Sequence, residues 1–344
     1  MSNKSYSLSR LEVSGSPFEV GLQLGRFGKE AVHSYLLGSA AWGTVQAWKG
    51  SATAQRMAQL TQERLPDIWA ELQGLAQGLD LPLDDVFLWN ARGDLWAMAP
   101  DGCTTIMTPG QGVQRITHNE DGDPGFAGHC AIVQCDVQGK PGFASFVYPG
   151  SIPGHTLAVN NLGLAMTVNN VRALYCQPGL PRMVLTRAIL DMPDVDAALR
   201  LLRDSPRAGA FHLNLGDTTQ ALVGVEYSSA MYSAIPVSQP VLHANHAIHP
   251  DTRNYPQIIT GSSGHRQVRG DALLAGNHPD PLHVLADTDG GRFTIFRRDP
   301  HDTDNENTLA TADIHLYSDR VEWAVYEDPR REPRFRLQNG RFVS

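Results

Sequence analysis

Apolar residues recur at helical spacing through the first hundred residues of the chain. The clearest run has apolar positions at i, i+3, i+4 and i+7, which form one buried helix face: Leu65, Ile68, Trp69, Leu72, Leu75 and Ala76. Ser16 and Pro17 predict the start of an earlier helix that ends near Ser34. Gly78 is a suitable C-terminal stop for the long helix. Asp84 or Asp85 is expected to cap a third helix, with Val86, Phe87, Leu88 and Leu95 on it.

From residue 103 onward the pattern changes to short apolar runs separated by turn residues. These runs predict hairpins that pair 129–137 with 143–148, 155–160 with 164–169, and 211–215 with 221–227, and later strands at 308–317 and 320–326. Helical spacing returns at 182–202, with a break near Pro193, and residues 278–281 and 297–307 look like loops. The order is helices, antiparallel strands, inserted helices and more strands. This order predicts an α+β protein and argues against repeated βαβ units.

Composition narrows the class of protein. The chain has 344 residues, 42% of them hydrophobic, and a formal net charge of −8, which is enough apolar material for a large core and a poor match to a nucleic-acid backbone. No apolar run is long enough for a membrane span, and the first residues contain no signal-like apolar segment. The four cysteines form no CxxC pair. We therefore expect a soluble, cytoplasmic protein with reduced thiols that binds neither nucleic acid nor membrane.

Cys103 is the first candidate for chemistry. It follows Gly102 directly, at the point where helical periodicity gives way to the first strand. A free cysteine is usually a small buried apolar residue. A nucleophilic cysteine needs a base and an oxyanion stabiliser. If the peptide bond before Cys103 were cut, the new α-amino group, with a reference pKa of roughly 7.7–8.0, would be a base beside its own thiol. A glycine at 102 removes side-chain bulk and permits unusual backbone angles at such a bond.

Several segments around and beyond Cys103 carry a family resemblance. They are Gly102-Cys103-Thr104-Thr105, His118 to Asp121, Tyr148 to His155, Asn161 to Asn170, Pro181-Arg182 and His243 to His246, with Glu19 to Gly25 and Glu71 to Asn90 upstream. In order and spacing they resemble the autoproteolytic acyltransferase and hydrolase family of isopenicillin-N acyltransferase, which belongs to the N-terminal-nucleophile hydrolases. Each motif is weak alone, but together they span nearly the whole chain.

The resemblance implies a single domain with a four-layer αββα sandwich of antiparallel sheets. It also implies an inactive precursor that cuts itself between Gly102 and Cys103. The products would be an α chain of residues 1–102, a helical pro-segment, and a catalytic β chain of residues 103–344. The two chains would stay associated because the helices of the first cover sheet faces of the second. No cofactor is implied, and association into a homo-oligomer is left open.

Catalytic roles also follow from the resemblance. Cys103 is the expected nucleophile, Asp121 the acid that orients the freed amine, and Asn245 the oxyanion donor. Without the family resemblance, Asp121 would be interpreted as a turn residue, and Asn245 as a residue that caps local backbone groups. Asn170 is a weaker site candidate, and Asn119 is expected to support the loop that carries Asp121. Thr105 would share a strand face with Cys103.

Glu120 bears on the substrate. The penicillin-forming members of the family tend to have an aromatic residue at this position, and the segment His118 to Gly122 is closer to the β-alanyl-amine hydrolase branch. A β-alanyl group ends in an ammonium, which requires a paired carboxylate when buried. Glu120 or Asp123 would supply it, unless both are solvated turn acids. We therefore expect hydrolysis of small N-acylated amines or amino acids, with β-alanyl amides such as carcinine favoured.

Three other functions remain open at this stage. The first is transfer of the same acyl group to an amine, with a coenzyme-A thioester as a donor, although Arg182, Arg187 and Arg266 could each be surface charges rather than a phosphate site. The second is an uncut scaffold protein. The third is a metallohydrolase, but His243, His246 and His249 lack the acidic context of a zinc site, and the sequence predicts no metal.

Overall fold

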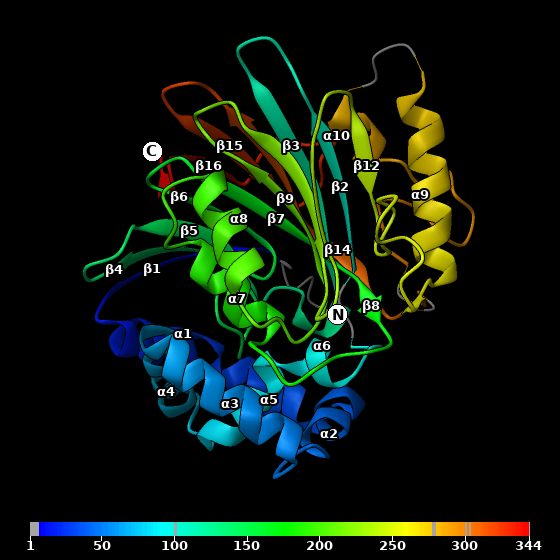
Figure 1. Cartoon of the computed structure of the whole chain (residues 1–344). Helices are drawn as coiled ribbons and strands as arrows, with labels where there is room; N and C mark the ends of the chain where they lie inside the picture. Colours follow the sequence, from blue (N-terminus) through cyan, green and yellow to red (C-terminus); the bar gives the residue numbers. More distant parts are fainter. Residues whose placement is uncertain (1–6, 100–101, 277–279, 300, 303, 344) are drawn as a thin grey trace, which may run out of the picture.

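Two β-sheets lie face to face between layers of helices in the computed structural model (Figure 1). The structure describes residues 7–99, 102–276, 280–299, 301–302 and 304–343. One sheet has the strand order β1-β4-β5-β6-β7-β9-β10-β11 and the other β12-β2-β3-β14-β15-β16-β17. Strand β2 contacts β7, and β3 contacts β9, so the two sheets share one interior. Apart from the parallel β1–β4 pair, the strand pairs of both sheets are antiparallel.

The first sheet is built from β1 (Ser9–Gly15), β4 (Ala131–Val137), β5 (Phe143–Val147), β6 (Leu157–Asn160), β7 (Ala165–Asn170), β9 (Phe211–Gly216), β10 (Leu222–Tyr227) and β11 (Tyr232–Pro236). The second is built from β2 (Gly102–Thr108), β3 (Gln114–Gly122), β12 (Val241–His243), β14 (Asn307–Leu316), β15 (Val321–Tyr326), β16 (Phe335–Gln338) and β17 (Arg341–Phe342). A small separate pair joins β8 (Arg172–Ala173) to β13 (Gln257–Ile258). The predicted hairpins are confirmed, to within a few residues at their ends.

Helices cover the outer side of each sheet. On the first sheet lie α7 (Arg182–Ile189) and α8 (Val195–Asp204), where the guanidinium of Arg187 stacks over Phe143 of β5. The predicted break near Pro193 is where α7 and α8 separate. On the second sheet, α9 (Gly261–Leu274) contacts β12 and α10 (Pro281–Leu285) contacts β3. The layers are therefore helix, sheet, sheet and helix, which confirms the predicted α+β sandwich.

The N-terminal helices gather at one end of the sandwich (Figure 1). They are α1 (Pro17–Ser34), α2 (Ala40–Gln46), α3 (Ala52–Arg64), α4 (Pro66–Leu79), α5 (Leu83–Asn90) and α6 (Arg92–Leu95), with the short 3₁₀ turns η1 (Leu36–Gly38) and, later in the chain, η2 (Pro124–Phe126). Helix α1 contacts β1 and β4, and α4 contacts α7. Among the described residues, the N-terminal helices therefore contact the first sheet at its β1–β4 edge.

Local details of these helices correct the sequence prediction in three places. The region before residue 103 is not purely helical, because β1 joins the sheet as an edge strand parallel to β4. Gly78 does not end α4. It lies inside the helix, where a Cβ would come within 2.3 Å of the Leu22 carbonyl oxygen of α1, and Asp80 takes the left-handed terminal position instead (φ 58°). Asp84 and Asp85 lie in the first turn of α5 rather than capping it.

Ser16 forms the predicted cap of α1. Its hydroxyl accepts from the Glu19 amide while the Glu19 carboxylate accepts from the Ser16 amide, a complete capping box. The helix this cap starts packs against α4, and apolar residues of both belong to the continuous core that includes strands of the two sheets. The segments predicted as loops at 278–281 and 297–307 lie partly outside the described residues, and Pro281 begins α10.

Candidate active site

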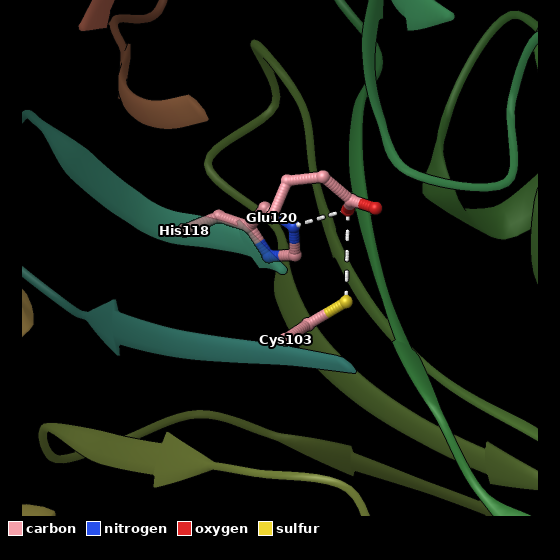
Figure 2. A group of neighbouring side chains, drawn as sticks. All are labelled: Cys103, His118 and Glu120. Carbon is pink, nitrogen blue, oxygen red and sulfur yellow. Dashed lines mark hydrogen bonds and ion pairs between the residues drawn. The ribbon is translucent and has the colours of Figure 1, made fainter. Parts of the chain in front are cut away.

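Strands β2 and β3 bring the central residues together. In their antiparallel register Cys103 lies opposite Glu120, and Thr105 lies opposite His118. Since side chains alternate along a strand, these four residues share the face that points toward the other sheet. Figure 2 shows the Cys103 thiol, the Glu120 carboxylate and the His118 ring converging from the two strands. Thr105 shares the strand face of Cys103, as predicted.

The thiol is buried and lies against a carboxylate. Cys103 is 3% exposed, and its Sγ lies 3.6 Å from Glu120 Oε2. The same oxygen lies 3.2 Å from His118 Nε2, and the other Glu120 oxygen accepts from the Tyr148 hydroxyl at 2.8 Å. Glu120 is therefore not the solvated turn acid that one alternative described. It is the group that links the thiol to the histidine.

Hydrogen-bond directions fix where the protons lie in this group. Asn169 donates its amide N–H to a backbone carbonyl, so its oxygen is the acceptor for the Thr105 hydroxyl at 2.8 Å. With its proton committed there, the Thr105 oxygen accepts from His118 Nδ1 at 2.7 Å. Burial lowers the pKa of His118 to about 3, so the ring is neutral and Nε2 carries a lone pair. This Nε2 faces Glu120 Oε2 at 3.2 Å.

The opposite face of the same strands is ionic. The Asp121 carboxylate accepts from the Thr308 hydroxyl at 2.7 Å, and its second oxygen lies 3.9 Å from Arg297 Nη1. Arg297 also donates to Glu306 at 2.5 Å. Burial raises the pKa of Asp121, while Arg297 and Arg266 oppose that shift. Asp121 lies opposite Gly102, the residue before Cys103, but its side chain is on the helix-covered side of the sheet.

Asn119 shares this ionic face and corrects a second prediction. Its side chain donates to the Leu285 carbonyl at the end of α10 and accepts from the Thr311 hydroxyl at 2.7 Å. Asn119 and Asp121 both lie inside strand β3, so neither belongs to a turn or loop. Asn119 therefore fastens a helix to the strand that carries Asp121.

The Asn245 side chain is hydrogen-bonded to the backbone of Cys103. Its side-chain oxygen accepts from the Cys103 N–H at 3.0 Å and from Arg266 Nη2 at 2.6 Å. Its amide nitrogen, the predicted oxyanion donor, donates to the Asn170 carbonyl at 3.2 Å. Arg266 also donates to the Cys103 carbonyl at 2.6 Å. In this structure Asn245 orients the Cys103 amide group rather than presenting a vacant N–H.

Arginines that sequence reasoning treated as surface charges are buried. Arg182, Arg187 and Arg266 are each no more than 2% exposed. Arg182 donates to the Asn170 side-chain oxygen at 2.6 Å, which links the weaker site candidate to α7. The surface reading was wrong because a guanidinium can be buried when carboxylates and carbonyls satisfy its donors.

Asp123 faces a hollow next to the site. Its carboxylate accepts from the Tyr35 hydroxyl at 2.7 Å. Both residues line a cavity of about 650 Å³ whose wall also includes Trp96, Asp304 and Glu306. The Glu306 carboxylate in turn lies against Gly102, where a Cβ would come within 2.2 Å of its oxygen. The predicted cleavage position therefore borders an acidic hollow, and only glycine fits there.

The histidine run at 243–249 does not converge as a unit. His246 bonds to Ser263 of α9, whereas His243 and His249 face Glu226 of β10. Among the described residues, two groups place ligand atoms within 4.8 Å of one another: Cys103 with His118 and Glu120, and His212 with Glu226 and His249. The first of these is the thiol site described above.

Sequence reasoning missed five residues of this neighbourhood: His118, Tyr148, Arg266, Arg297 and Glu306. The first had a usable signal, because it lies two positions from Glu120 on a strand and so shares its face. The others come from α9 and the segments beside β5 and β14, and no spacing in the chain joins them to Cys103.

A buried cysteine at the start of a strand, facing a second sheet in a helix-covered sandwich, is the arrangement that the family resemblance implies. The model of the acyl-coenzyme A:6-aminopenicillanic acid acyl-transferase family matches residues 108–331. The chain therefore belongs to this family. It is 25% identical over 370 residues to the beta-alanyl-dopamine/carcinine hydrolase of Drosophila melanogaster, an alignment that covers 95% of each protein.

Two solved structures are more distantly similar. The conjugated bile acid hydrolase of Clostridium perfringens is 12% identical, with a TM-score of 0.41 over 69% of this chain and 92% of the other. The penicillin V acylase of Agrobacterium tumefaciens is 13% identical, with a TM-score of 0.35 over 65% of this chain and 82% of the other. The hydrolase relative supports an amide-cleaving cysteine hydrolase, and acyl transfer is the less favoured alternative. No helix among the described residues has the length and apolarity to cross a membrane.

Proposed function

We propose that the protein is a self-processing cysteine amidohydrolase that cleaves β-alanyl amides. The precursor cuts its own bond between Gly102 and Cys103 and leaves chains of residues 1–102 and 103–344 associated. The observation that carries this proposal is the Cys103 thiol 3.6 Å from a buried carboxylate, with its backbone amide held by Asn245. Extensive contact of β1 with β4 favours continued association of the two chains.

Self-cleavage takes place before any free amine exists, so the precursor needs another base. Glu120 is in place for this role. It accepts the thiol proton at Oε2, which leaves a thiolate and a protonated carboxyl group beside the neutral His118 ring. The thiolate then attacks the Gly102 carbonyl carbon, and the bond from this carbon to the Cys103 nitrogen breaks as the departing nitrogen takes the proton from Glu120. Water hydrolyses the resulting thioester and frees the Gly102 carboxylate and the Cys103 thiol.

After cleavage the Cys103 nitrogen becomes an α-amine. Asn245 Oδ1 already accepts from this nitrogen at 3.0 Å and would hold the amine beside its own thiol. In turnover the amine serves as base, the thiolate attacks the substrate carbonyl, and the leaving amine takes a proton as a thioester forms. Water activated by the same amine releases the acid. Release of Asn245 Nδ2 from the Asn170 carbonyl would free an N–H for the oxyanion.

Glu120 also favours the β-alanyl group. In a β-alanyl thioester on Cys103, two methylene groups separate the carbonyl carbon from the ammonium, so the ammonium reaches a carboxylate that lies 3.6 Å from the sulfur. The Drosophila relative is named for β-alanyl-dopamine and carcinine. The cavity with Tyr35, Trp96 and Asp123 offers aromatic surface and negative charge for the amine half of such a substrate.

Amine release from β-alanyl-histamine tests this function when it is measured beside propionyl-histamine, which lacks the ammonium. We expect kcat/KM for the β-alanyl amide to be higher by on the order of 10²-fold or more, because the uncharged analogue leaves a buried carboxylate unpaired. Cys103→Ala should be inactive, and Cys176→Ala, a cysteine outside the site, should retain activity. Equal rates on both amides would refute the substrate, and activity in Cys103→Ala would refute the mechanism.

A further inference from the structure

A second buried cluster of histidines lies apart from the thiol, where β9, β10 and the segment after β12 meet. It consists of His212, Glu226 and His249, whose ligand atoms all lie within 4.8 Å of one another. The three residues are far apart in the sequence. None of them contacts Cys103 in the hydrogen bonds described above.

Hydrogen-bond directions place a lone pair of His212 toward the carboxylate. Asn214 donates its amide group to Asn169 at 2.8 Å and to Thr167, so the Asn214 oxygen is an acceptor. His212 Nε2 lies 3.0 Å from that oxygen and must therefore carry the ring proton. Nδ1 is left with its lone pair and has no hydrogen-bond partner among the described residues. It lies 3.7 Å from Glu226 Oε1.

A lone pair that faces a carboxylate oxygen is repulsive, and a cation between the two atoms would relieve that repulsion. The same Glu226 oxygen also lies 3.0 Å from His243 Nε2 and accepts from the Ile248 N–H at 2.7 Å. His212 is 2% exposed and Glu226 is 1% exposed, so water does not screen this repulsion.

The surroundings are built to orient these groups. His249 Nδ1 bonds to Ser233 at 3.1 Å, which directs Nε2 inward. That Nε2 and His212 Cε1 both approach Gly224, where a Cβ would lie 3.4 and 3.3 Å from them, so glycine leaves room where the two rings converge. Backbone N–H groups of Ile248 and His249 donate to Glu226, as supporting groups do around metal-bound carboxylates.

We propose that His212 Nδ1, Glu226 Oε1 and His249 Nε2 bind a divalent transition-metal ion such as Zn²⁺. Two imidazoles and a carboxylate are a ligand set that zinc accepts. His243, stacked on His212 with ring centroids 3.4 Å apart, supplies the nearest further imidazole. The ion would tie the segment after β12, which contains Asn245 of the active site, to the first sheet. The site is structural and takes no part in the amide chemistry.

Zinc binding to the purified wild-type protein tests the proposal directly. Isothermal titration calorimetry with Zn²⁺ should show one ion per chain. Thermal unfolding with Zn²⁺ present should show a rise in melting temperature that a chelator reverses. His212→Gln and His249→Gln should weaken binding by more than the roughly 10–100-fold that loss of a supporting partner costs. His246→Gln, a histidine of the same segment that bonds to Ser263 instead, should bind as the wild type does.

Cys103→Ala separates this site from the thiol group, which is the other candidate. Binding should persist in this variant, and Co²⁺ bound to the wild type should show d–d absorption without a thiolate charge-transfer band. Absence of zinc binding by the wild type overturns the proposal, as does loss of binding in Cys103→Ala. If the ligand variants fail to fold, the wild-type Co²⁺ spectrum alone decides between nitrogen–oxygen and sulfur ligation.

Discussion

The two faces of the β2–β3 strand pair differ in how they hold their charges. On the face toward the first sheet, Cys103, His118 and Glu120 are joined by hydrogen bonds that contain a transferable proton. On the opposite face, Asp121 and its neighbours Arg297 and Glu306 form ion pairs. Both faces are buried, so the difference is not one of solvent exposure.

This difference assigns a task to each face. A hydrogen-bonded group with a neutral histidine can pass a proton, whereas carboxylates beside arginines hold fixed charges and fixed positions. The ionic face lies against Gly102, and Arg266 reaches the Cys103 carbonyl from the same side. The first face is therefore suited to the chemistry, and the second holds the backbone on which the chemistry takes place.

The largest effect is expected from Glu120→Gln. Glutamine keeps the size of the side chain but cannot accept the thiol proton, so self-cleavage should slow by on the order of 10²–10⁴-fold. The rate is measured from the loss of uncut chain with time after synthesis. Glu322→Gln on β15, half-exposed in the same sheet, is the matched control. Cleavage of Glu120→Gln at the wild-type rate would remove Glu120 from the proton path.

Arg297→Gln should act on stability. It removes the arginine paired with Asp121 and one of the two arginines paired with Glu306, and loss of one member of a buried pair costs up to about 3–5 kcal/mol. Urea unfolding measures the change in unfolding free energy. Arg298→Gln alters the neighbouring arginine, which is exposed, and should change stability by less than about 1 kcal/mol. Similar losses in both variants would contradict the role given to the ionic face.

The smallest expected effect is a difference between the two faces in how their residues make folding stability depend on pH. The pKa of His118 is lowered to about 3 from 6.5, so its contribution to stability is complete above pH 6.5 and is lost as the pH falls toward 3. Burial raises the pKa of Asp121, so protonation favours the folded state on the other face. As the pH falls below 6.5, the stability advantage of the wild type over His118→Gln should shrink, and its stability relative to Asp121→Asn should rise. Changes of the same sign in both comparisons would refute the assignment.

Local patterns predicted much of the fold. The hairpins, the α7–α8 break and the Ser16 capping box each depend on neighbouring residues, and each was found as expected. The parallel strand β1 was not predictable, because its pairing with β4 depends on residues more than a hundred positions away. Gly78 was misread for the same reason, since its partner is α1 rather than its own helix end.

The residues of the candidate site also divide into those that the sequence could predict and those that it could not. The family resemblance identified Cys103, Asp121 and Asn245, and strand alternation added Thr105. Strand alternation could also have shown that Glu120 and Asp121 point to opposite faces, which gives them different partners. The arginines of the ionic face could not have been inferred, because the tertiary fold brings Arg266 of α9 and Arg297 to the strand pair from distant parts of the chain.

The central claim is that Cys103 cuts its own chain. Intact-mass spectrometry of the wild type beside Cys103→Ala tests it most directly. We expect two associated fragments in the wild type, the second beginning at Cys103, and a single chain of 37.6 kDa in the variant. A single uncut chain in both proteins, or cleavage that survives Cys103→Ala, would contradict the account.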